Sequence, residues 1–188
     1  MDRPRERVLE VAWDLLIERG LADLTLAELG RRVDTSPGHL LYYFGSKDEL
    51  LLETLRWSEE QLWQRWTVMR AEPTPVGERV RAFCELFLPV APGDPRWLLW
   101  IEAWPRVLRV EPLREPYLAL DARWHDALAE LLAEADVPEP DHLARRICAL
   151  LDGFSVALAL DEEGLTVAEV CDHALALLPA HLTDVSVS

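Results

Sequence analysis

Residues 24–51, LTLAELGRRVDTSPGHLLYYFGSKDELL, decide the fold of this 188-residue chain. A helix is expected to begin after Thr25, because the Thr25 hydroxyl can cap a backbone amide and Glu28 can return the bond. A second short helix is expected from Pro37, because proline suits the first helical position and Ser36 can cap it. Two short helices joined by a tight turn predict a helix-turn-helix motif.

Further helices are expected on both sides of this motif. Apolar residues recur at helical spacing from Arg3 to Arg19, and Gly20 can end that helix in the left-handed conformation. Gly45 is expected to end the motif's second helix, and a long helix is expected from Ser46 to Arg70. The remaining predicted helices cover residues 75–88, 95–111, 113–135, 141–160 and 166–179, which makes nine in total.

The composition favours an all-α protein. Leucine and alanine supply 35 and 21 residues and isoleucine only 3, a balance that favours helix over strand. Half of the residues are hydrophobic and 28% are charged, which argues against a disordered chain. No apolar run approaches the roughly 20 residues of a membrane-spanning helix. The charged N-terminus lacks the apolar region of a secretion signal, so we expect a cytoplasmic protein with no membrane partner.

The charge balance excludes broad electrostatic coating of nucleic acid. The formal net charge is −15, and residues 1–50 contain 7 basic and 10 acidic side chains. The acidity is therefore concentrated after residue 50, and a small docking surface near the N-terminus remains open because attraction to phosphate depends on local fields. The three cysteines are far apart and match neither a disulfide framework nor metal-ligand spacing, so no metal or cofactor is expected.

The predicted second helix of the motif has residues suited to contact with DNA. Small residues at Pro37 and Gly38 leave room for His39 to approach base edges, and Tyr42 and Tyr43 add hydroxyl donors. Free amides at helix N-termini attract phosphate.

The segments Leu24–Gly30 and Ser36–Leu51, with a Tyr-Tyr-Phe ending followed by Lys47, resemble the DNA-binding domain of TetR-type transcriptional regulators. The resemblance implies a three-helix DNA-binding domain over residues 1–46 and a larger helical effector-binding and dimerisation domain over residues 47–188. It also implies that Thr25, Tyr42 and Lys47 contact the DNA backbone and that residues 35–39 read bases. The full set of DNA-binding residues expected here is Thr25, Thr35, Ser36, Pro37, Gly38, His39, Tyr42, Tyr43 and Lys47.

Three positions depart from the family pattern. Gly30 stands where alanine is usual, which weakens the helix by up to about 1 kcal/mol. Asp34 stands where glycine often makes the turn, and Leu41 replaces a frequent tyrosine, which puts one phosphate contact in doubt. Simpler interpretations also stay open: the tyrosines could be half-buried packing residues, His39 a solvated surface residue, and Lys47 a counter-charge to neighbouring acids.

Seven of the eight tryptophans lie between residues 57 and 124. Tryptophan at helical spacing is more often core than pocket, but an aromatic cavity between helices is also a plausible small-molecule site, and the resemblance favours the second interpretation. Glu102 and His125 are weak candidates for polar anchors. The residues expected to line an effector pocket are Trp63, Trp66, Phe83, Phe87, Trp100, Trp104 and Trp124.

The last two predicted helices are more apolar than a monomer's surface requires. Such a surface suggests a partner, and a two-fold contact of four helices would cover it. Alternatively, both helices are central in one domain. The residues expected at a dimer interface are Ile147, Leu150, Leu151, Phe154, Leu158, Val170, Ala174 and Leu177.

Together these features predict a homodimeric transcriptional regulator, a repressor that binds a palindromic operator and is released by a small apolar or aromatic effector. Two alternatives remain: an all-α ligand-binding protein or enzyme that retains the helix-turn-helix shape, and a DNA-binding protein without an effector. No nucleophile–base constellation, metal-ligand spacing or phosphate-binding glycine loop favours an enzyme. A ligand-induced thermal shift with loss of operator binding would distinguish a regulator with an effector from one without.

Overall fold

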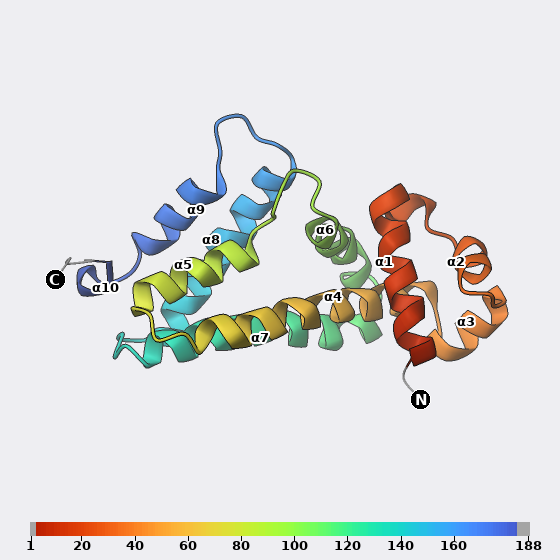
Figure 1. Cartoon of the computed structure of the whole chain (residues 1–188), viewed down its shortest axis with the longest axis horizontal. Coiled ribbons are helices and arrows are strands. Elements are labelled where there is room, and N and C mark those ends of the chain that lie inside the picture. Colours follow the sequence, from red (N-terminus) through yellow and green to blue (C-terminus); the bar gives the residue numbers. More distant parts are fainter. Residues whose placement is uncertain (1–2, 184–188) are drawn as a thin grey trace. The chain divides into compact units, whose positions relative to one another are not determined.

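The computed structural model describes residues 3–183, and over this range the chain is helical with no strand (Figure 1). The all-α prediction is confirmed. Within the described residues, no helix combines the length and apolarity needed to cross a membrane. The helices are α1 (Arg3–Asp23), α2 (Leu26–Arg32), α3 (Pro37–Phe44), α4 (Lys47–Arg70), α5 (Val76–Phe87), α6 (Pro95–Val107), α7 (Glu111–Ala133), α8 (Pro140–Ala159), α9 (Val167–Leu175) and α10 (Ala180–Thr183).

The chain divides into two compact units. The first contains Met1–Gln61 together with Leu98–Tyr117, and the second contains Leu62–Trp97 together with Leu118–Ser188. The first unit therefore includes the beginning of α4 and most of α6 in addition to the helix-turn-helix motif. This is a division by packing, whereas the boundary expected between residues 46 and 47 is a division by function and stays a prediction.

The predicted starts of α2 and α3 are confirmed by their caps, whereas α1 continues past Gly20 to Asp23 and α6 ends at Val107, before the predicted residue 111. The Ser36 hydroxyl accepts a hydrogen bond from the His39 amide at 3.1 Å, and the Thr25 hydroxyl accepts one from the Glu28 amide at 3.2 Å. Gly20 interrupts α1 with φ +74°, and Gly45 follows α3 with φ +76°, the left-handed conformation that glycine adopts without strain. These local bonds determine where α2 and α3 begin and end.

Gly30 is required by the turn between α2 and α3. A Cβ atom at Gly30 would lie 2.6 Å from the carbonyl oxygen of Thr35, which is closer than a methyl group tolerates. The Gly30 carbonyl accepts a hydrogen bond from the Thr35 amide at 2.8 Å, and Asp34 completes the turn with φ +55°. Glycine weakens α2, as expected, but only glycine allows the turn before α3 to approach α2 this closely.

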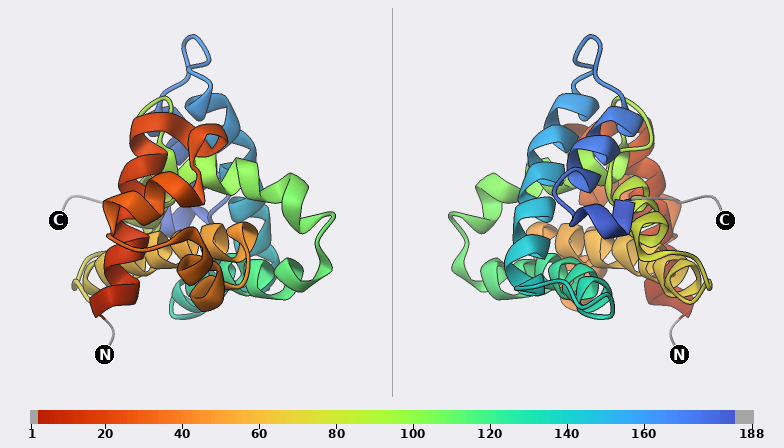
Figure 2. Two further views of the ribbon diagram at one scale, coloured as in Figure 1. Left: turned by 90° about the vertical axis from the view of Figure 1, so that its right-hand side faces the viewer. Right: turned by 90° about the vertical axis from the view of Figure 1, so that its left-hand side faces the viewer.

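The second unit is built from α5, α8, α9, α10 and parts of α4 and α7. Helix α9 packs against both α5 and α8 (Figure 2), and Val170, Cys171 and Ala174 form its buried face. Helix α9 ends at Leu175, before the predicted end near Pro179, and a tenth helix, which was not predicted from the sequence, follows that proline. The Leu182 carbonyl of α10 approaches Gly77 of α5 so closely that no side chain would fit there.

Replacing Gly30 with alanine should destabilise the protein in spite of alanine's higher helix propensity. The clash with the Thr35 carbonyl involves backbone on both sides, so relief requires a shift of the turn, and we expect a loss of about 1–3 kcal/mol. Thermal unfolding followed by circular dichroism measures the change. Gly38→Ala is the matched control, because its Cβ would meet only the Ser36 hydroxyl at 3.9 Å, and it should not destabilise the fold. An unchanged melting temperature for Gly30→Ala would contradict the steric argument.

Candidate DNA interface and effector region

Helix α3 exposes three aromatic side chains. Tyr42 is 83% exposed and Tyr43 is 55% exposed, while Leu40 and Phe44 on the opposite side of α3 are buried. The Tyr43 ring packs edge to face against both neighbours, with ring centroids 4.7 Å from His39 and 5.5 Å from Tyr42. The structure therefore brings these three predicted DNA-binding residues together on one exposed surface, in contrast to the half-buried tyrosines of the simpler interpretation.

The other predicted DNA-binding residues differ in their exposure to solvent. Thr35 and Lys47 are half-buried, whereas the rest are exposed: Thr25, Ser36, Pro37 and Gly38. Leu41, the departure from the family pattern, is 41% exposed rather than part of the core. Helix α3 contains no charged residue, so any recognition by it depends on hydroxyl, imidazole and apolar contacts.

The arginines of α2 are held by carboxylates. Arg31 binds Glu28 at 2.6 Å, and Arg32 binds Glu18 at 2.5 Å and Glu28 at 3.3 Å. The hydrogen bond from Arg31 lowers the pKa of Glu28, and the hydrogen bond from Arg32 lowers the pKa of Glu18. These ion pairs leave α2 with little net positive charge.

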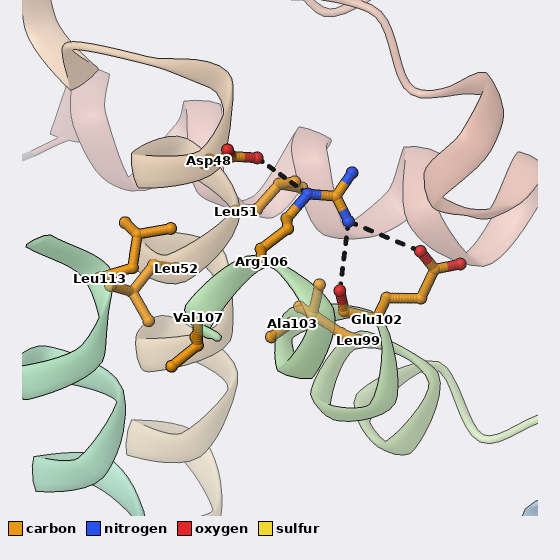
Figure 3. A pocket seen from close by; sticks show the side chains of 9 residues that line it. All are labelled: Asp48, Leu51, Leu52, Leu99, Glu102, Ala103, Arg106, Val107 and Leu113. Carbon is orange, nitrogen blue, oxygen red and sulfur yellow. Dashed lines mark hydrogen bonds and ion pairs between the residues drawn. The ribbon is translucent and has the colours of Figure 1, made fainter. Parts of the chain in front are cut away.

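The start of α4 is tied to α6 within the first unit. The Arg106 guanidinium donates to the Asp48 carboxylate at 2.8 Å and to the Glu102 carbonyl at 3.2 Å (Figure 3). The same side chains border a hollow of about 20 Å³, roughly the space of one water molecule, whose walls include Leu52 and Val107. The sequence carried no signal for this contact, because Asp48 and Arg106 are far apart in the chain.

Five of the seven predicted pocket residues form one aromatic cluster in the second unit. Trp124 contacts Trp63, Phe83 and Phe87, with ring centroids 5.5 to 6.4 Å apart, and Trp66 packs against Phe83 at 5.2 Å. Among residues 3–183, the Nε1 atom of the fully buried Trp66 finds no hydrogen-bond partner. Most of these rings contribute to the core, whereas Trp63 is half-exposed at its edge.

The other two predicted pocket residues, Trp100 and Trp104, belong to the first unit. Trp100 is buried, packs edge to face on Tyr117 at 4.8 Å, and donates a hydrogen bond from Nε1 to the Glu59 carboxylate at 2.8 Å. Trp104 is 36% exposed. The seven aromatic residues therefore do not line one continuous wall within either unit.

A cation lies on the ring of Trp63, which the sequence did not indicate. The guanidinium carbon of Arg123 lies 3.8 Å from the Trp63 ring centroid, at cation–π distance. Arg123 precedes Trp124 in α7, and only the packing of α7 against α4 reveals the contact. No periodicity or local motif could have indicated it.

The eight predicted interface residues of α8 and α9 fall into two groups. Leu150 and Phe154 are half-exposed and Leu177 is 41% exposed, so these three are accessible to a partner. Phe154 also stacks on His173, with nearly parallel rings whose centroids are 5.5 Å apart. The others lie in the core of the second unit: Ile147, Leu151, Leu158, Val170 and Ala174.

Two carboxylates with raised pKa values lie on neighbouring helices in the second unit. Burial raises the pKa of Asp152 in α8 to about 7, with a smaller contribution from the charge of Asp121 in α7. Burial also raises the pKa of Asp121, and the charges of His125 and Arg145 oppose that rise. His125 Nδ1 is 3.7 Å from an Asp121 carboxylate oxygen. Ionisation of Asp152 is thus disfavoured in the folded chain.

The capped turn and the exposed α3 define a helix-turn-helix DNA-binding protein. Residues 8–54 match the family model described as bacterial regulatory proteins of the tetR family. Residues 76–183 match the model described as the C-terminal region of BetI-type transcriptional repressors. The chain therefore belongs to the TetR family of transcriptional regulators, with a C-terminal region of the BetI type, and this family consists of regulators rather than enzymes.

Curated relatives and solved structures agree with this assignment. The chain is 28% identical over 165 residues to the HTH-type transcriptional regulator BetI of Paraburkholderia phytofirmans. The matched region covers 85% of this chain and 83% of the relative. A transcriptional regulator from Saccharomonospora viridis, solved in complex with choline, is 26% identical with a TM-score of 0.79 and covers 93% of this chain and 94% of its own. A TetR regulator from Haloarcula marismortui, 18% identical with a TM-score of 0.78, covers 94% of this chain and 97% of its own and shares the fold.

The raised pKa of Asp152 predicts a pH-dependent stability. In the unfolded chain this carboxyl ionises near pH 4, whereas the folded chain retains the proton to about pH 7. The folded state thus binds more protons between these values, so raising the pH through this window should lower the free energy of unfolding. Asp152→Asn should remove that loss, and its stability relative to the parent protein should increase from pH 5 to pH 8 in urea unfolding.

Asp141→Asn is the control for this measurement, because it removes an exposed carboxylate from the same helix and leaves Asp152 in place. We expect this control to retain the pH dependence of the parent protein. A constant stability difference between Asp152→Asn and the parent across the pH range would show that Asp152 is not protonated in the folded state.

Proposed function

We propose that this protein is a homodimeric repressor that binds a palindromic operator and leaves it when a small effector binds. The observation that carries the proposal is the exposed surface of α3, where His39, Tyr42 and Tyr43 lie together at the end of a capped turn. In helix-turn-helix proteins, this helix enters the major groove, and two copies related by two-fold symmetry read two half-sites. Residues 1–46 would bind DNA, and a regulator of transcription would act in the cytoplasm.

Dimerisation would use the outward surface of α8 and α9. Leu150, Phe154 and Leu177 provide exposed apolar area there, and Gly153 between them has open space around its α-carbon. Two such helices from each chain would form a four-helix contact. The buried members of the predicted interface, such as Ile147 and Val170, would support this surface from inside the chain.

The effector would be a small organic cation of the quaternary ammonium class. The Saccharomonospora viridis regulator was solved with choline, and the aromatic cluster around Trp124 has the chemistry that recognises such cations. This proposal differs from the apolar or aromatic effector expected from the sequence, because choline is a charged and non-aromatic molecule. Residues 47–188 would bind it, and no cofactor would be required.

Release from DNA would follow from differential affinity. An effector can shift the protein between two conformations only by binding one of them more tightly. If the favoured conformation separates the two α3 helices by a distance that does not match the half-sites, operator affinity falls. The same linkage requires that operator binding weaken effector binding by an equal factor.

Native mass spectrometry of the protein with a duplex that it selects from a random pool tests the proposal. We expect two chains per duplex, and choline should reduce the bound fraction at constant ionic strength. Sodium chloride at matched concentration is the control. One chain per duplex would contradict the dimer, and operator binding that choline leaves unchanged would favour a regulator without this effector.

Tyr42→Phe should weaken binding to all duplexes by a similar factor. A hydroxyl bound to phosphate carries no sequence information, and its loss costs about 1 kcal/mol, or about fivefold in affinity. Fluorescence anisotropy against operator and unrelated duplexes measures the effect. His39→Ala is the contrasting variant, because loss of a base contact should change the preference at one position of each half-site. If Tyr42→Phe preferred a different operator consensus from the parent protein, Tyr42 would be a base-contacting residue instead.

A further inference from the structure

An arginine of the chain occupies the ring face of Trp63. The guanidinium carbon of Arg123 is 3.8 Å from the ring centroid, closer than Arg5 is to Phe44 at 5.0 Å or Arg96 is to Trp97 at 5.5 Å. A cation over the face of tryptophan is attracted by the negative charge of the π system, and tryptophan binds cations better than the other aromatic residues. The chain thus holds one of its own cations in the kind of site that recognises organic cations.

The ring of Trp63 is held in place from the side of the core. Trp124 packs against it with ring centroids 5.5 Å apart and planes at 66°, and Trp124 in turn contacts Phe83 at 5.9 Å. Trp124 and Phe83 are buried, whereas Trp63 and Arg123 are both half-exposed. The position above Trp63 is therefore at the surface of the second unit, where a small cation from solvent can reach it.

We propose that the face of Trp63 is the recognition site for the quaternary ammonium group of the effector, and that Arg123 is an internal competitor which the effector displaces. The inference rests on the effector class given under the proposed function and adds the site and its regulation. Arg123 keeps the ring face covered when effector is absent, and the effector must replace one cation–π contact with another.

The chemistry of the two cations favours such an exchange. A quaternary ammonium group has no N–H donor, so an aromatic face is its best partner in a protein. A guanidinium has five donors that can bind water or carboxylates, so Arg123 does not depend on the ring of Trp63 for its partners. The formal net charge of −15 further favours the approach of a cation. Displacement also removes a contact between α7 and α4, and α4 is the helix that begins at Lys47 beside the DNA-binding residues.

The experiment is a calorimetric titration of the full chain and its variants with choline chloride and tetramethylammonium chloride at constant ionic strength. Arg123→Gln should bind both cations about two- to fivefold more tightly than the parent, because the competitor is gone. Trp63→Leu should bind them at least about tenfold more weakly, and Trp63→Phe should retain part of the affinity. Arg146→Gln, which changes an exposed arginine of α8, should bind like the parent. Circular dichroism confirms that each variant is folded.

An uncharged analogue of choline shows how much of the affinity comes from the positive charge and how much from the shape of the ligand. In 3,3-dimethyl-1-butanol a carbon replaces the nitrogen of choline, so it should bind the parent at least about tenfold more weakly than choline if the cation–π contact dominates. Equal binding of both molecules would contradict the proposed site.

The outcomes distinguish this inference from the proposed function. If the parent binds choline but Trp63→Leu binds it equally well, the effector class stands and the site is wrong. If Arg123→Gln binds choline no more tightly than the parent, Arg123 is not a competitor. If neither the parent nor Arg123→Gln binds a quaternary ammonium ion, the effector class itself is refuted and the site with it.

Discussion

The close approach of the Thr35 carbonyl to Gly30 determines how α3 leaves α2. A side chain at Gly30 would collide with that carbonyl at 2.6 Å, while the hydrogen bond from the Thr35 amide to the Gly30 carbonyl draws the two segments together. The Ser36 cap then starts α3 at once, so that Leu40 and Phe44 on its inner side are buried and Tyr42 and Tyr43 on its outer side are exposed. The proposed DNA-binding surface depends on this turn, because α3 has no charged residue that could compensate for a misplaced helix.

Most of the fold could be predicted from the sequence because its helices begin and end with local signals. Ser36 and Thr166 each accept a hydrogen bond from the amide three residues later, and the glycines at 20 and 45 adopt the positive φ expected of them. Such contacts involve neighbours in the chain, so one sequence is enough to find them. The short helix α10 was not predicted, because Pro179 was interpreted as the end of the preceding helix, whereas α9 already ends at Leu175 and the proline directly precedes α10.

The contacts that decide the effector region could not be predicted, because they join residues far apart in the sequence. The spacing of the tryptophans does not show that Trp100 and Trp63 belong to different units. Trp100 donates a hydrogen bond to Glu59 in the first unit, whereas the ring of Trp63 contacts Arg123 in the second. Helical spacing also could not tell which apolar residues of α8 face the chain's own core. Ile147 proved to be fully buried, whereas Phe154 meets His173 on the outward side.

An acidic protein that binds DNA must rely on the fit of a small surface rather than on its overall charge. The measurement that tests this account most directly is selection of bound duplexes from a random pool by the purified full chain, at low ionic strength and without effector. The account predicts enrichment of a palindromic consensus whose half-sites are separated by about one helical turn or more. Recovery of unenriched sequence, or of no duplex at all, would contradict the claim that α3 reads DNA.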